Sequence, residues 1–267
     1  MIQFLKHFKC GLGLIFGLTL MAGAAQAPKQ IDVPKLSETI DSVVVPLPGE
    51  VFTALNKING VNWKEYVRTD RGSNFTKRPR IALLLGSVIA DGFIAVQAED
   101  TPAVKDIGQR VQALAERINV KRSITEHAKA IIEGADKKKW DSVRQELDRT
   151  QSSVQQAMNE LHDEKLSQLV SLGGWLRGTE VLTSVVTKNF SASGAELLHQ
   201  PDLLVYFQSQ LDGMPEFKSE TSLIEQIQGA LLEVKPLIST RKKISAESVR
   251  KINQITTRLD DAIVKKD

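Results

Sequence analysis

Hydrophobic residues along this chain recur mainly at intervals of three and four positions, the spacing that places them on one face of an α-helix. The clearest series are Val104, Ile107, Val111, Leu114 and Ile118, and then Trp140, Val143, Leu147, Val154, Met158 and Leu161. No convincing series alternates hydrophobic and polar residues in the way that half-buried strands do. The pattern therefore predicts an all-α protein, a single bundle of about eight mostly antiparallel helices.

The expected helix boundaries follow from the glycine, proline and polar residues that flank the periodic segments. Helices are predicted over residues 80–99, 101–118, 123–134, 140–161, 166–187, 203–211, 222–234 and 246–264. Thr101 and Pro102 are expected to open their helix as cap and first-turn residues, and Ser123 and Glu126 have capping-box spacing. The glycine pair at 173–174 predicts a break or bend within its helix.

The segment over residues 80–99 is apolar on nearly every side, which predicts a central helix covered by its neighbours. Asp91 interrupts the apolar run near its middle. A charged residue at that position argues against a membrane span. We therefore expect no stable membrane span once the N-terminal segment described next has been removed.

The N-terminus has the pattern of a secretory signal peptide. Lys6 and Lys9 precede an apolar run at residues 11–21, and small residues follow as far as Ala27. The apolar run is too short to cross a bilayer and matches the central region of a signal peptide. We expect a signal peptide over residues 1–25 and a periplasmic or extracellular protein. An uncleaved membrane anchor is the alternative.

The cleavage position is expected within Ala24–Ala27. Cleavage after Ala27 would leave Pro28 as the first residue of the mature chain, and proline there hinders signal peptidases. Cleavage after Ala24 or Ala25 is therefore favoured, because small residues precede both sites.

The remaining chain is expected to comprise an irregular arm at residues 26–48 and one α-helical domain at 49–267. Within the arm, Ser42–Val45 is a candidate for a short extended segment. The only cysteine is Cys10, so the mature chain contains none. A chain of this length can bury a sizeable core without disulfides. The absence of cysteine from the mature chain fits a bacterial periplasmic protein.

The charge balance excludes nucleic acid as an expected partner. The chain has 35 Lys and Arg against 32 Asp and Glu, and removing Lys6 and Lys9 with the signal leaves 33 against 32, a net charge of +1. Nucleic-acid-binding proteins usually carry a clustered basic surplus. The short basic runs here abut expected helix ends, where solvated charge clusters are ordinary.

Residues 172–180, LGGWLRGTE, form the most unusual segment of the sequence. Glycine costs about 1 kcal/mol relative to alanine inside a helix, so the three glycines need a reason. Close approach of a second helix supplies one, since Gly174 and Gly178 share a helix face. Gly86 and Gly92 lie on the apolar central helix, so we expect these four glycines to allow a close helix crossing.

The same two helices carry the candidate polar site. Asp91 lies in an apolar stretch, and a buried carboxylate needs a partner, which we expect to be Arg177. Together with Trp175 and Glu180 these residues are the candidate ligand-binding site, in which the Arg177 fork would hold an anionic ligand. The favoured alternative is a buried ion pair that fixes how the helices pack.

The sequence contains no HExxH motif, Walker loop, GxSxG motif or dinucleotide-binding fingerprint. We expect no catalytic residue, metal or cofactor. The expected function is that of an exported, non-enzymatic helical binding or scaffolding protein, with a protein or small molecule as its partner. The alternative is an enzyme or ligand-dependent sensor that uses the polar residues Asp91, Arg177 and Glu180.

Overall fold

The computed structural model describes residues 37–40, 43–46, 60–68, 75–214, 221–239 and 243–265. The chain divides into two units, Met1–Lys35 and Leu36–Asp267, and all of the described residues lie in the second. The expected signal peptide at residues 1–25 lies outside the described residues.

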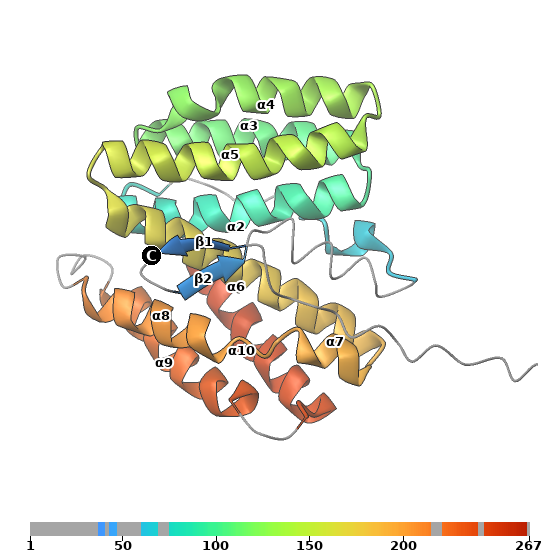
Figure 1. Cartoon of the computed structure of the whole chain (residues 1–267), viewed down its shortest axis with the longest axis vertical. Coiled ribbons are helices and arrows are strands. Elements are labelled where there is room, and N and C mark those ends of the chain that lie inside the picture. Colours follow the sequence, from blue (N-terminus) through green and yellow to red (C-terminus); the bar gives the residue numbers. More distant parts are fainter. Residues whose placement is uncertain are drawn as a thin grey trace, which may run out of the picture. The chain divides into compact units, whose positions relative to one another are not determined.

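The described part of the chain is an all-α bundle, as the hydrophobic pattern predicts (Figure 1). Its eight long helices are α2 (Arg78–Gln97), α3 (Thr101–Arg117), α4 (Lys121–Asp136), α5 (Trp140–Glu160), α6 (Glu164–Lys188), α8 (Pro201–Asp212), α9 (Thr221–Ile238) and α10 (Ala246–Val264). The short helices η1 (Trp63–Tyr66) and α7 (Ala192–Glu196) complete the described helical elements. The α10 boundaries are those predicted.

Helices α2 and α6 form the centre of the bundle and share its most extensive contact. Helices α3, α4 and α5 pack on one side of this pair, and α8, α9 and α10 lie on the other side (Figure 1). Every residue of α2 from Pro79 to Val96 is buried. By length and hydropathy α2 is the one described helix that could cross a membrane, and 94% of its most apolar window is buried inside the bundle.

Two short strands lie within the expected N-terminal arm. The strands β1 (Ser37–Ile40) and β2 (Val43–Pro46) pair antiparallel, with Ser37 opposite Pro46 and Ile40 opposite Val43. The extended segment expected over Ser42–Val45 thus belongs largely to β2. Its three consecutive β-branched valines favour a strand.

Helices α2 to α5 all end in the same way. The second residue beyond each helix has a positive φ: Glu99 (52°), Asn119 (68°), Lys138 (53°) and His162 (54°). The next amide then donates to a carbonyl five residues earlier, as in Asp100 N to Ala95 O at 3.0 Å. This is the Schellman ending, which usually uses glycine. It produces the tight turns that make neighbouring helices antiparallel.

Two expected caps are different in the structure. The cap of α3 is Asp100, whose carboxylate accepts a hydrogen bond from the Ala103 amide at 3.1 Å, while Thr101 donates to the Ala135 carbonyl. Helix α4 begins at Lys121, so Ser123 lies inside its first turn and cannot cap it. Helix α3 therefore starts at Thr101 as predicted but has a different cap, and α4 starts two residues before the predicted Ser123.

The α2–α6 crossing depends on Gly86 and Gly173. A Cβ atom at Gly86 would lie 1.9 Å from the Val170 carbonyl oxygen, and one at Gly173 would lie 2.0 Å from the Leu83 carbonyl oxygen. Both distances are far below any real contact, so only glycine fits at these positions. Helix α6 continues through Gly173 without the expected break, because the glycines serve contact with α2 rather than a bend.

The other glycines expected at the crossing have different surroundings. A Cβ at Gly174 would make an ordinary contact of 3.5 Å with the Gly86 carbonyl oxygen. At Gly92 it would lie 3.4 Å from Ile107 on α3, and at Gly178 nothing lies within 4 Å. The assignment of Gly92 and Gly178 to the α2–α6 crossing is therefore corrected.

These distances predict opposite effects for two neighbouring glycines. Gly173→Ala should lower the free energy of unfolding by about 1–3 kcal/mol, because the new methyl group overlaps the α2 backbone. Gly178→Ala should raise it by up to about 1 kcal/mol, because alanine favours the helix and meets nothing. Urea unfolding of both variants measures the difference, and equal effects would contradict the crossing geometry.

Candidate functional site

A buried polar cluster lies where α2, α6 and α10 meet the segment 60–68. We call Asp91, Arg177, Glu180, Asp260 and Arg68 the polar cluster. Asp91 and Asp260 are 0% exposed, Arg177 is 1% exposed and Glu180 is 8% exposed. The structure thus brings together three of the four expected ligand-binding residues and adds two that were not expected.

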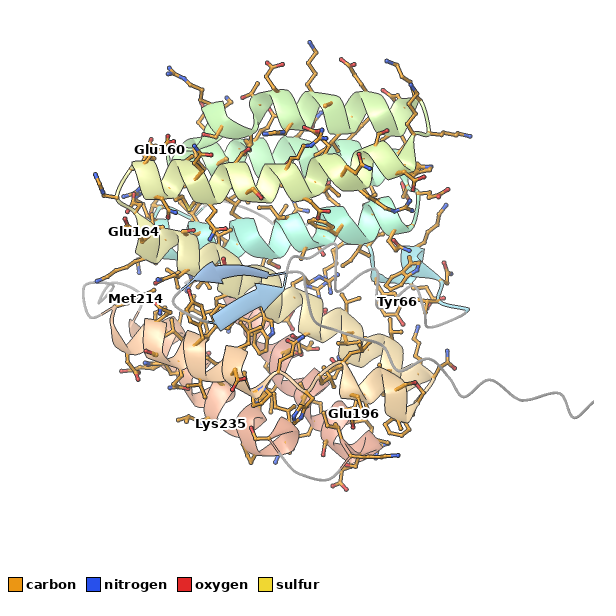
Figure 2. The ribbon with its side chains drawn as sticks, in the orientation of Figure 1. Tyr66, Glu160, Glu164, Glu196, Met214 and Lys235 are labelled. Carbon is orange, nitrogen blue, oxygen red and sulfur yellow. The ribbon has the colours of Figure 1, made fainter. Side chains whose placement is uncertain are left out.

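Arg177 is the centre of the polar cluster. Its Nε donates to Asp91 Oδ1 at 2.6 Å, and its Nη1 donates to Glu180 Oε2. Its Nη2 donates to the main-chain carbonyl oxygen of Tyr66 at 2.6 Å, and Figure 2 labels this residue of η1. Each of the three guanidinium nitrogens therefore has a protein acceptor, which leaves Arg177 poorly placed to clamp an anionic ligand.

Arg68 extends the polar cluster toward the surface. Its Nη2 lies 2.6 Å from Glu180 Oε2, and its Nη1 donates to Asp260 Oδ2. Ser87 on α2 donates to the other oxygen of Asp260 at 2.8 Å. Two arginines thus face three carboxylates, and the cluster joins three helices and the η1 segment.

One oxygen of the polar cluster is unsatisfied. Asp91 Oδ2 is buried and has no hydrogen-bond partner among the described residues. Among the described residues, Arg177 is therefore the one side chain that forms a hydrogen bond or ion pair with Asp91. Removal of the arginine would leave a buried carboxylate without a partner, which is strongly unfavourable.

Asp260 could have been found from the sequence. It lies four residues after Thr256 and three before Ile263, so it falls on the buried face of α10. A carboxylate at such a position signals a buried partner. Arg68 lies in a short segment without clear periodicity, and nothing in the sequence links it to α6 or α10.

An apolar cavity lies on the other side of the α2–α6 contact. Its volume is about 80 Å³, and it is partly open to solvent. It is lined by residues from five helices and the turn before α8, including Gly86, Ala90, Gly174, Trp175, Gly178, Leu182, Gln200, Val234 and Ile252. Asp91, Arg177 and Glu180 are not among its lining residues.

Trp175 belongs to this cavity and not to the polar cluster. Its Nε1 donates to Gln200 Oε1 at 3.0 Å, and its ring lies 5.5 Å from that of Phe207 on α8. Trp175 and Arg177 are two residues apart, which turns them about 200° from each other around the helix. Of the three expected ligand-binding residues on α6, Trp175 therefore lies on a different face from Arg177 and Glu180.

A second cavity, of about 260 Å³, lies between α8 and α9. It is larger but more open, and the exposed side chains of Val205 and Leu232 form part of its lining. The charged residues Asp212 and Lys235 also line it. Because it is open and has exposed side chains in its lining, we describe it as a surface groove.

His127 on α4 links two residues of α5 in the order found in a hydrolytic triad. Its Nε2 lies 2.8 Å from Ser153 Oγ, and its Nδ1 lies 2.5 Å from Glu146 Oε1. Ser153 lies inside α5, where neighbouring amides bond within the helix and cannot form an oxyanion hole. The arrangement is therefore a polar link between α4 and α5.

Glu146 remains ionised in this link. Partial burial raises its pKa, but hydrogen bonds from His127 and Arg149, with the charges of both residues, outweigh burial and give a lowered pKa. By contrast, burial raises the pKa of Asp148 on the same helix. Within the described residues, no group of three or more His, Cys, Asp and Glu side chains has an arrangement that could hold a metal ion.

Comparison with protein-family models, with curated proteins and with solved structures finds no match to this chain. The geometry of the two faces of α6 therefore carries the functional argument.

The polar cluster predicts a large effect for Arg177→Ala. This variant should lose about 3–5 kcal/mol of unfolding free energy, because it leaves Asp91 buried without a partner. The control is Arg149→Ala, where the side chain is 66% exposed and its single ion pair should contribute less than about 1 kcal/mol. Equal melting temperatures for the two variants would refute the buried pair.

The lowered pKa of Glu146 predicts a pH-dependent effect for Glu146→Gln. Ionised Glu146 stabilises the fold above the ordinary glutamate pKa, and this stabilisation is lost as the pH falls through the lowered pKa. Glu146→Gln should therefore be less stable than the original chain at about pH 7, with the difference shrinking in acid. Glu126→Gln, at an exposed position on α4, is the control. A pH-independent difference would contradict the ionised link.

Proposed function

We propose that this chain is an exported, non-enzymatic helical protein that binds a small molecule in the cavity between α2 and α6. The observation that carries the proposal is the cavity itself. It is apolar, partly open, and placed beside the close glycine contact that fixes the two central helices. Sites that bind small molecules are usually preformed apolar cavities with few polar groups.

Binding without chemistry is supported by the state of the polar residues. The polar cluster is satisfied mainly by its own members, and Arg177 uses all three of its nitrogens on protein acceptors. A catalytic site needs titratable groups that face the substrate. The alternative, an enzyme or sensor that uses Asp91, Arg177 and Glu180, would require this cluster to open.

Export is supported by the N-terminal sequence. The basic residues, the short apolar run and the small residues that follow match a secretory signal peptide. We infer a periplasmic location for the mature protein, with cleavage after Ala24 or Ala25.

Fractionation of a Gram-negative host that expresses the full chain tests export. We expect the periplasmic fraction to contain a protein whose intact mass is that of a chain starting at Ala25 or Gln26. Leu14→Asp places a charge in the apolar run, so this control should remain in the cytoplasm. Full-length protein in the cytoplasm for both chains would overturn export.

Native mass spectrometry of the same purified protein tests binding. The expected result is an adduct of defined mass that survives gentle ionisation, disappears on denaturation and contains no metal. Two results together would overturn the binding function. The protein from every fraction would have to be free of any adduct, and none of the small molecules added to it would raise its melting temperature. A protein that converts the bound molecule would support the enzyme alternative.

A further inference from the structure

The chemical character of the cavity between α2 and α6 limits what it can hold. Among the described residues that line it, none has an ionisable side chain. Its polar groups are neutral amides and hydroxyls, from Gln155, Ser167, Ser171, Thr179 and Gln200. An ionised ligand group would lose its water there without gaining a counter-charge, which is strongly unfavourable.

The nearby charges do not change this conclusion. Arg177 and Glu180 are on the same helix as the cavity residues, but they pair with each other and with Asp91 on the opposite face. The cavity therefore has no charged group to offer an anion or a cation.

The size of the cavity suits a short apolar segment. A volume of about 80 Å³ has room for roughly six water molecules, at roughly 10–15 Å³ for each. Leu182, Val234, Ile238 and Ile252 are among the apolar residues that line this space. A short alkyl chain would therefore fill it, and the rest of a ligand would lie at its open side.

Gly178 keeps this space open. A side chain at this position would meet nothing within 4 Å, so packing against another element does not require glycine there. Glycine also lowers helix stability relative to alanine. Gly178 lines the cavity, and a larger side chain at this position would occupy the volume available to a ligand.

One part of the cavity wall offers a neutral hydrogen-bond donor. Gln200 Oε1 accepts from Trp175 Nε1 at 3.0 Å, which turns the amide nitrogen of Gln200 away from the indole. That nitrogen has no partner among the described residues and can donate to a hydroxyl or carbonyl oxygen.

We propose that the cavity binds an uncharged molecule with a short apolar segment and one hydroxyl or carbonyl group held by Gln200. The proposal rests on the proposed function, that of a small-molecule-binding protein, and adds the chemical class of the ligand. Short-chain alcohols are the simplest members of this class.

Three probes of equal chain length and different charge test the class: hexan-1-ol, hexanoate and hexylammonium. Each is titrated into the purified full chain at about pH 7, and the indole N–H signals are followed by NMR. The chain has three tryptophans. Only Trp175 lines the cavity, so Trp63 and Trp140 serve as internal references.

Hexan-1-ol should shift the Trp175 signal and bind at least about tenfold more tightly than either charged probe, because these probes must lose their hydration. Gly178→Leu should abolish the shift by filling the cavity. Gly229→Leu is the matched control, since Gly229 is also helical and has nothing within 4 Å, but lies exposed on α9. Its titration should match that of the original chain.

The outcomes separate the ligand class from the proposed function. Equal or tighter binding of hexanoate or hexylammonium at Trp175 would overturn the uncharged class and leave the binding function in place. Loss of binding in both glycine variants would overturn the role of Gly178. If no probe shifts Trp175 in the original chain and its native mass spectrum has no adduct, both proposals fail. If Gly178→Leu does not fold, Gly178→Ala provides the same test. This variant should bind hexan-1-ol more weakly than the original chain, with a smaller loss of affinity than the leucine would cause.

Discussion

The close contact between α2 and α6 at Gly86 and Gly173 is the constraint on which the rest of the structure depends. Side chains larger than hydrogen at either position would overlap the main chain of the opposite helix. The contact sets how closely α6 packs against α2, and this close packing brings Arg177 within hydrogen-bond distance of Asp91. It also leaves an apolar cavity that Gly174 and Gly178 line.

The two faces of α6 have opposite chemistry for a physical reason. Buried charges are tolerated only when they are paired and hydrogen-bonded, and the polar cluster gathers its arginines and carboxylates on one face. The described residues that line the cavity on the other face have no ionisable side chain, which suits an uncharged ligand. Pairing within the cluster and the neutrality of the cavity are thus linked consequences of how α2, α6 and α10 pack.

Much of the helical architecture could be predicted because helical periodicity is strong in segments such as Ala246–Val264. Helix ends were less predictable, because residues such as Lys138 and His162 occupy left-handed positions where glycine is usual. The Asp91–Arg177 contact could be anticipated, since a carboxylate in an apolar run needs a partner. The placement of Trp175 and Arg177 on different faces of α6 depends on the rotation of that helix against its neighbours. The presence of Arg68 in the polar cluster depends on long-range packing, which local sequence does not encode.

A crystal structure of the protein with hexan-1-ol would test the central claim most directly, namely that one crossing separates a paired polar cluster from a neutral binding cavity. We expect Arg177 Nε within hydrogen-bond distance of Asp91 and the alkyl chain beside Gly178, on the opposite face of α6. A carboxylate of Asp91 distant from Arg177, or the alcohol bound among the charged residues, would contradict this account.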